Sequence, residues 1–247
     1  MLAIIGGSGL AKLSDFKMTR RQVVQTPYGE PSSPLAFGTL GGGEIVFLAR
    51  HGYGHTIPPH EINYRANIWA LHAQGVKRVL AVASVGGIRA DLGPGVLAVP
   101  DQIVDYTHGR AATFVAGNGD VSHADFTYPY CAQLRAECLA AARRAGENIV
   151  DGGVYGATQG PRLETAAEIN RFERDGVDMV GMTGMPEAVL AREIGLCYAA
   201  LAVVANHAAG RGSSSDGIAM SGITTVLEPA MKRVRVILEQ LTQADGG

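Results

Sequence analysis

The stretch that decides the fold is VYGATQGPRLET, residues 154–165. A β-type run ends in Gly160-Pro161, and a helical pattern begins at about Glu164 and continues to Asp175. Because proline suits the first turn of a helix and glycine permits a sharp bend, this stretch predicts a strand, a turn and a helix. Glu164 would then lie at the carboxyl end of a strand, where open α/β sheets bind ligands. A structural role remains open, since an acidic residue in a first turn also favours the helix dipole.

Outward from this stretch, predicted strands and helices alternate along the whole chain. Buried strands are expected at residues 2–5, 78–85, 177–180 and 196–205, a hairpin at 35–40 and 44–49, and short β segments at 96–99 and 102–105. Helices are expected at 63–74, 130–144, 188–194 and 223–241, the last interrupted near Pro229. The alternation has no linker and no internal repeat, so it indicates one α/β domain over residues 1–247.

The composition excludes several classes of protein. The chain has 247 residues, 33 of them glycine, and a formal net charge of −2, so no basic surface for nucleic acid is indicated. No apolar run approaches the roughly 18 residues of a membrane span, and the apolar start is too short for a secretory signal. Cys131, Cys138 and Cys197 make no even disulfide framework and no paired metal motif. We therefore expect a cytoplasmic protein without a membrane segment.

Polar residues follow the ends of the predicted strands: Ser8 in the Gly-rich turn at 6–10, Arg50 and His51 after the hairpin, then Ser84, Glu164, Met182 with Thr183, and Asn206. A Gly-rich turn and a guanidinium can together bind an anion. The turn lacks the Gly-Lys-Ser/Thr end of a Walker A loop and the last glycine of a dinucleotide fingerprint. Taken singly, each feature also fits an ordinary turn or a solvated loop. The histidines at 51, 55 and 60 have no recognised ligand spacing, so no metal site is expected.

Together and in this order, these residues resemble the family of trimeric purine nucleoside phosphorylases and methylthioadenosine phosphorylases. The match covers nearly the whole chain, and segments 4–10, 49–52, 55–57, 63–70 and 160–162 look most like the methylthioadenosine branch. The resemblance implies a single-domain α/β fold with a central mixed β-sheet flanked by helices. It also implies that phosphate attacks C1′ of a purine nucleoside and releases the base and a ribose 1-phosphate. No metal or organic cofactor is implied, and inorganic phosphate is a co-substrate.

The resemblance also assigns roles to individual residues. Phosphate would be bound by Ser8, Arg50, His51, Ser84 and Thr183, with backbone near Ala83. The nucleoside would contact Leu163, Glu164, Met182 and Asn206, of which Glu164 and Asn206 would act on the departing base. The reaction needs both groups, because the dianion must be held under the sugar and the base must receive hydrogen bonds as it becomes negative.

The base site looks like the hypoxanthine type. The adenosine-type branch typically carries Ser where this chain has Glu164, and Asp where it has Asn206 and Ala208. The 6-oxopurine branch carries Glu and Asn at the first two of these places. A carboxylate accepts from N1–H of hypoxanthine but opposes the unprotonated N1 of adenine, and an amide can donate to N7 or O6. Sites of this kind discriminate by roughly 10⁴ to 10⁵. Leu163 departs from the Phe common beside this Glu, so weaker stacking on the base is expected.

At the 5′ end, Met220, Ile223 and Leu227 occupy the region where the inosine-type branch often places a His. Such side chains suit an S-methyl group, whose burial is worth roughly 0.8 kcal/mol; an ordinary core stripe at helical spacing is the alternative. The expected substrate is therefore S-methyl-5′-thioinosine. Alternatives are an inosine or guanosine phosphorylase, a methylthioadenosine phosphorylase, a hydrolase, and a non-catalytic nucleoside- or NAD-binding protein.

An assembly is also implied by the resemblance. Aromatic side chains, Phe126, Tyr128 and Tyr130, cluster in the segment 121–130, which suggests an interface rather than a solvated connector. The family forms cyclic trimers in which a His of this loop reaches into the neighbouring pocket, and His123 matches that position. We expect a homotrimer in which each active site is completed by His123 of the partner subunit. A local turn cap is the alternative role for His123.

Overall fold

The computed structural model describes residues 1–7, 10, 16–115 and 123–243. Strand β5 (Arg78–Gly87) is its centre, because three other strands pair with it. Strand β1 (Leu2–Gly6) runs parallel to the first half of β5, and β11 (Cys197–His207) runs parallel along its whole length. The short β10 (Met179–Gly181) pairs antiparallel with the last residues of β5. A continuous apolar strand covered on both faces was predicted here, and the structure confirms it.

The described strands form one mixed sheet, as expected. One path through it runs β2-β3-β4-β1-β5-β10-β9-β7, and β11, β6 and β8 continue from β5 on a second path. The remaining strands are β2 (Lys17–Gln22), β3 (Leu35–Leu40), β4 (Gly43–Ala49), β6 (Leu97–Val99), β7 (Gln102–Asp105), β8 (Val150–Asp151) and β9 (Val154–Ala157). Strands β3 and β4 form the predicted hairpin, and β9 is the strand predicted before Gly160.

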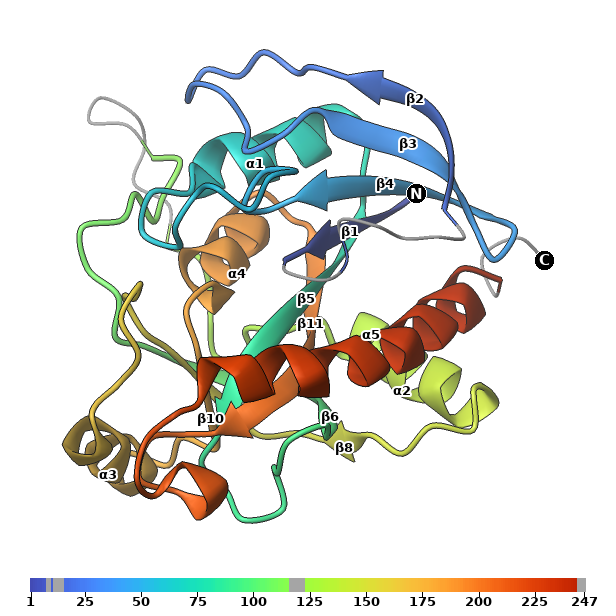
Figure 1. Cartoon of the computed structure of the whole chain (residues 1–247). Helices are drawn as coiled ribbons and strands as arrows, with labels where there is room; N and C mark the ends of the chain where they lie inside the picture. Colours follow the sequence, from blue (N-terminus) through green and yellow to red (C-terminus); the bar gives the residue numbers. More distant parts are fainter. Residues whose placement is uncertain (8–9, 11–15, 116–122, 244–247) are drawn as a thin grey trace.

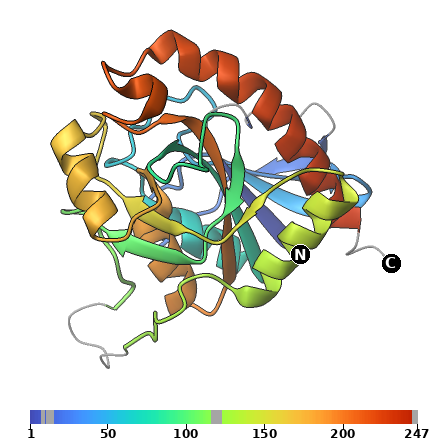
Figure 2. The same ribbon diagram turned by 90° about the horizontal axis from the view of Figure 1, so that it is seen from below.

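Helices cover both faces of this sheet (Figure 1). Helices α1 (Tyr64–Ala73) and α4 (Gly184–Glu193) pack together on one face. Helices α2 (Ala132–Arg144) and α5 (Met220–Gln243) lie side by side on the other, as Figure 2 shows. The alternation of side chains along a strand explains the two layers: Ala3 and Ile5 face α1 and α4, whereas Leu2 and Ile4 face α2 and α5.

Helix α3 (Ala166–Arg174) begins two residues later than expected. The reason is a capping box, in which the Thr165 hydroxyl accepts from the N–H of Glu168 (3.1 Å) and the Glu168 carboxylate accepts from the N–H of Thr165 (2.8 Å). Pro161 lies outside the helix and follows a cis peptide bond from Gly160, so the expectation that it opens the helix is wrong. Glu164 therefore lies in the turn between β9 and α3.

Helix α5 is continuous through Pro229, and the predicted interruption is wrong. Pro229 and Thr225, the residue whose carbonyl loses its partner, are both exposed, so water can satisfy that carbonyl. The buried stripe of Val234, Ile237 and Leu238 fixes the helix against the sheet. Packing of the apolar face thus outweighs the missing hydrogen bond.

A disulfide joins Cys131, at the start of α2, to Cys197, at the start of β11. It corrects the expectation that the cysteines form no disulfide pairing. The two residues are 66 positions apart, and the pairing brings their Cα atoms to 5.1 Å. Cys138 is free and buried. Nothing in the spacing of three cysteines singles out this pair.

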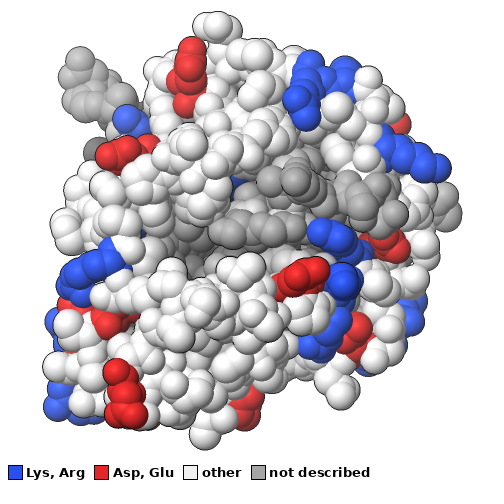
Figure 3. All heavy atoms as spheres, in the orientation of Figure 1, with Lys and Arg blue, Asp and Glu red and all other residues white. Residues whose placement is uncertain are grey.

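The surface agrees with the composition. On the face drawn in Figure 3, Lys and Arg are interspersed with Asp and Glu over a largely uncharged surface. Within the residues that the structure describes, no helix is long and apolar enough to cross a membrane.

Candidate active site

Arg50 lies where β4 ends beside β1 and β5. Its N–H donates to the carbonyl of Gly6 (2.9 Å), and its Nη1 donates to the carbonyl of Val82 (3.1 Å) on β5. A Cβ placed on Gly7 would lie 3.6 Å from Nη1 of Arg50 and 3.7 Å from Cδ2 of His51. The backbone after β1 therefore passes directly beside both side chains. Ser8, the next residue of that turn, lies outside the described residues.

Thr183 approaches the same place from β10. Val180 pairs antiparallel with Gly86 of β5, and Met182 and Thr183 follow directly after β10. The N–H of Thr183 donates to the hydroxyl of Tyr155 (3.4 Å), and the Thr183 hydroxyl makes no capping bond to α4. Ser84 is exposed, whereas Ala83 and Thr183 are buried. Of the residues assigned to phosphate, Ala83 and Ser84 therefore directly follow Val82, whose carbonyl accepts from Arg50.

Glu187 on α4 balances the charge of Arg50, and sequence reasoning missed it. Nε and Nη2 of Arg50 donate to the two carboxylate oxygens at 2.7 and 2.9 Å, and the Tyr198 hydroxyl donates to the same carboxylate at 2.9 Å. Burial alone lowers the pKa of Arg50, but the adjacent carboxylate outweighs it and raises the pKa above its ordinary value. Three of the five guanidinium N–H donors are used by described residues, which leaves two for a ligand.

His51 is held in one tautomer. Its Nδ1 lies 2.8 Å from the carbonyl of Ile57, which can only accept, so Nδ1 carries the proton of the neutral ring. Burial lowers the pKa of His51 to about 4, and the Arg50 charge contributes to the shift. The ring is therefore neutral near pH 7, and Nε2 can accept a hydrogen bond from a phosphate hydroxyl.

The expected base-reading residues lie at the ends of β9 and β11. The Thr158 hydroxyl donates to Oε1 of Glu164 at 2.6 Å, and the N–H of Thr158 donates to the carbonyl of Gly181 at 2.8 Å. Asn206 pairs with Gly86 on the opposite side of β5 from β10, and its Nδ2 donates to the carbonyl of His207 at 2.6 Å. Both side chains are half-buried. The same end of β5 therefore lies between Glu164 and Asn206.

Met182 and Arg110 make contacts that join the segments after β9 and β10. A Cβ on Gly160 would lie 2.4 Å from the Met182 sulfur, so the thioether packs directly on a glycine whose φ is +59°. The Arg110 guanidinium donates to the main-chain carbonyls of Met182 (2.8 Å), Met185 (2.6 Å) and Gln159 (2.8 Å). It thereby ties the ends of β9 and β10 to the long loop after β7. Sequence reasoning missed Arg110 because that loop has no periodic pattern.

The side chains assigned to the 5′ substituent are less enclosed in the single chain. Met220 is 64% exposed, Ile223 is half-buried, and Leu227 packs against the core beneath α2 and α5. Leu163 is also exposed. Only Leu227 therefore fits the alternative of a core stripe.

The aromatic loop divides between core and surface. Tyr130 is buried and its ring stacks on that of Tyr198, with centroids 6.1 Å apart, so its expected place in an interface is wrong. Phe126 packs against the core, whereas His123 is exposed and Tyr128 is 72% exposed. Residues 121 and 122 of this segment lie outside the described residues.

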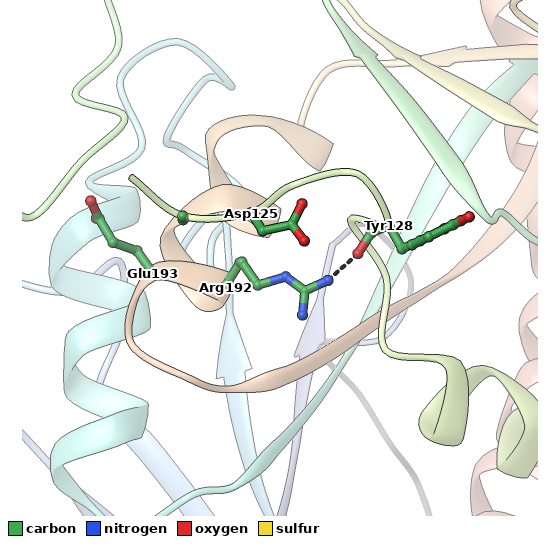
Figure 4. Close-up of a pocket in the computed structure, with 5 residues that line it drawn as sticks. Asp125, Tyr128, Arg192 and Glu193 are labelled. Atoms are coloured by element: carbon green, nitrogen blue, oxygen red, sulfur yellow. Dashed lines mark hydrogen bonds between the residues drawn. The ribbon is translucent and has the colours of Figure 1, made fainter. Parts of the chain in front are cut away.

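A pocket of about 290 Å³ lies between this loop and the end of α4 (Figure 4). It is lined by Ala124, Asp125, Tyr128, Arg192 and Glu193. Arg192 donates to the Tyr128 carbonyl, and the Asp125 carboxylate faces the same guanidinium. None of the expected site residues lines it. Within the described ranges, no three His, Cys, Asp or Glu side chains are grouped to hold a metal ion.

Comparison with known proteins decides the family. Residues 1–242 match the sequence model of the Phosphorylase superfamily. The chain belongs to this superfamily. It is 52% identical to a probable S-methyl-5′-thioinosine phosphorylase from Xanthomonas campestris pv. campestris, over 98% of this chain and 97% of that one. It is also 48% identical to a 6-oxopurine nucleoside phosphorylase from Pyrococcus furiosus, over 85% of this chain and 80% of that one.

Solved phosphorylases have the same fold. The methylthioadenosine phosphorylase from Schistosoma mansoni, in complex with adenine, superposes with a TM-score of 0.93 at 34% identity, over 99% of this chain and 91% of that one. The resemblance of the sequence to this family is thereby confirmed.

Proposed function

We propose that this phosphorylase cleaves the N-glycosidic bond of S-methyl-5′-thioinosine with inorganic phosphate. The products are hypoxanthine and 5-methylthioribose 1-phosphate. The observation that carries the proposal is the pair of half-buried readers, Glu164 and Asn206, at the end of β5. A Glu carboxylate opposite N1–H and an Asn amide opposite N7 or O6 match a 6-oxopurine and reject a 6-aminopurine. The names of relatives about half identical to the chain support this choice.

Phosphate is the nucleophile in this proposal. The turn with Ser8, the side chains of Arg50, His51 and Thr183, and β5 near Ala83 and Ser84 hold it beneath the sugar. One phosphate oxygen forms a bond to C1′ while the bond from C1′ to N9 breaks, and the electron pair of that bond leaves on the purine. Asn206 donates to the base as its charge grows, and Glu164 accepts from N1–H. We propose no metal and no organic cofactor.

The rest of the nucleoside contacts apolar side chains. Met182 lies under the ribose, Leu163 lies beside the base, and Met220, Ile223 and Leu227 surround the 5′-methylthio group. We propose a homotrimer in which His123 of the partner subunit closes the 5′ end. The exposure of Met220 and His123 in the single chain supports this arrangement. A role in purine and methylthio salvage in the cytoplasm is consistent with these reactants.

The decisive experiment compares methylthioinosine, methylthioadenosine, inosine and adenosine side by side, with and without phosphate. We expect the highest kcat/KM for methylthioinosine and no release of base without phosphate. A higher kcat/KM for inosine would favour the second candidate, a 6-oxopurine nucleoside phosphorylase like the relative from Pyrococcus furiosus. Release of base in water would contradict phosphorolysis.

A further inference from the structure

The Glu164 carboxylate is held by one hydroxyl. Within the described residues its hydrogen-bond partner is Thr158, whose Oγ1 lies 2.6 Å from Oε1. Glu164 precedes α3 and so takes no support from the hydrogen bonds of that helix. The capping residues Thr165 and Glu168 bond to each other. The direction of the Glu164 side chain therefore depends on Thr158.

Thr158 is itself fixed on all sides. It follows β9 and is 7% exposed. Its N–H donates to the carbonyl of Gly181, and its carbonyl accepts from Nη2 of Arg110 at 3.3 Å. A β-branched side chain on such a backbone has few rotamers. The hydroxyl is therefore a rigid support for the carboxylate of Glu164, which lies in the turn before α3.

From these contacts we infer that Thr158 is a specificity-determining positioning residue for the base; the inference rests on the proposed role of Glu164. Donation from Thr158 occupies Oε1 and leaves Oε2 to accept from N1–H of a 6-oxopurine. A 6-aminopurine needs a donor at this point, which Glu164 provides only when protonated. Because Thr158 fixes Oε1, Oε2 faces N1 as an acceptor, which suits the N1–H of a 6-oxopurine and opposes the unprotonated N1 of a 6-aminopurine.

The test uses Thr158→Val, which keeps the shape and removes the hydroxyl, and Thr158→Ser, which keeps the hydroxyl. We expect Thr158→Val to lower kcat/KM for methylthioinosine by about 10- to 100-fold, the range for a hydrogen bond to a charged group. The kcat/KM for methylthioadenosine should change far less, so the ratio of kcat/KM for methylthioinosine to that for methylthioadenosine falls. The KM for phosphate should stay unchanged, and Thr158→Ser should recover most of the ratio. If Thr158 had a merely structural role, Thr158→Val would lower kcat/KM for both nucleosides and weaken phosphate binding at the same time.

A double-mutant cycle with Glu164→Gln separates this inference from the proposed function. Glu164→Gln alone should reduce discrimination, and adding Thr158→Val to it should have little further effect on the substrate ratio. If Glu164→Gln reduces discrimination while Thr158→Val leaves it within twofold, the role of Thr158 is overturned and the base-reader assignment stands. If Glu164→Gln leaves discrimination unchanged, the base-reader assignment fails, and the inference about Thr158 fails with it.

Discussion

Glu187 and Arg50 form an ion pair that is closed to solvent, with side-chain exposures of 0% and 1% and two parallel N–H to oxygen contacts. Bidentate geometry fixes the plane of the guanidinium as well as its position. The carboxylate comes from α4 and the guanidinium from the end of β4, so the pair joins the helical layer to the sheet. In the proposed site, Arg50 would therefore offer phosphate a fixed set of donors rather than an unbalanced charge.

Glu187→Gln is expected to destabilise the fold by about 3–5 kcal/mol, because one partner of a buried pair is left unbalanced. The KM for phosphate should also rise as the guanidinium loses its orientation. Urea unfolding and phosphate titration measure the two effects. Tyr198→Phe, which removes only the third hydrogen bond to Glu187, is the matched milder variant, expected to cost about 1 kcal/mol. Equal midpoints for wild type and Glu187→Gln would contradict the role of this pair.

The double variant Glu164→Ser with Asn206→Asp is expected to shift preference toward 6-aminopurines. The acceptor opposite N1 is removed, and the amide donor is replaced by an acceptor for the 6-amino group. The measurement is kcat/KM for methylthioinosine and methylthioadenosine in parallel. Should the variant keep its activity on methylthioinosine and still ignore methylthioadenosine, the two residues do not read the base.

His51 makes stability depend on pH. The pKa of its folded-state ring is about 4, below the ordinary value of 6.5, so the unfolded chain takes up a proton first as the pH falls. The contribution of neutral His51 is therefore complete above pH 6.5 and is lost as the pH falls toward 4. His51→Asn should show a smaller loss of urea midpoint between pH 7 and pH 4.5 than wild type, whereas the control His60→Asn should follow wild type. Identical pH profiles for wild type and His51→Asn would refute the buried neutral ring.

The proposed trimer predicts complementation between inactive chains. Arg50→Ala removes a group from a subunit's own site, whereas His123→Ala removes the group given to its partner. Mixed trimers of the two should recover activity, because some sites receive both intact parts. A mixture of Arg50→Ala with Thr183→Ala is the control, since both residues belong to the same subunit's site and no complete site forms. Verified mixed trimers without recovery, or a monomer in sedimentation, would rule out the shared site.

The disulfide should stabilise the fold by reducing the conformational entropy of the unfolded chain. Closing a loop of 66 positions between Cys131 and Cys197 is worth about 4 kcal/mol in the chain-entropy description. The double variant Cys131→Ser with Cys197→Ser should therefore unfold at a lower urea concentration than the oxidised protein, and at the same concentration as the reduced protein. Coincident urea unfolding curves for the oxidised and reduced wild type would show that the disulfide adds no stability.

Apolar runs and the glycines at strand ends predicted the buried strands of the sheet. The runs at 2–5 and 196–205 became β1 and β11 because strands covered on both faces need unbroken apolar sequence. Strand β2, Lys17–Gln22, was not predicted because its residues are mostly polar and largely exposed at an edge of the sheet. The continuity of α5 through Pro229 was not predicted, because tertiary packing overrides the local signal of a proline.

The local pattern singles out a candidate site residue only where its type is unusual for its position, and the other roles were assigned from the resemblance to the family. Arg50 and His51 at a strand end attract attention, whereas Glu187 follows a proline in a first helical turn, where Glu is common. Thr158 resembles any β-branched residue of a strand, and its contact with Glu164 depends on the turn between them. Hydrogen bonds such as those of Glu187 and Thr158 depend on which residues the fold brings together, and the sequence pattern does not indicate them.

In the proposed reaction, strand β5 sets the distance between the phosphate and the residues that recognise the base. The phosphate contacts that we propose gather at Val82 to Ser84, and Asn206 pairs with Gly86, two residues farther along the same strand than Ser84. At about 3.3 Å per residue, the pitch of the backbone sets a separation of roughly 7 Å between Ser84 and Gly86. No side chain determines that spacing. Exchanging the residues that recognise the purine can therefore alter which nucleoside is cleaved while the separation of nucleophile and leaving group stays constant.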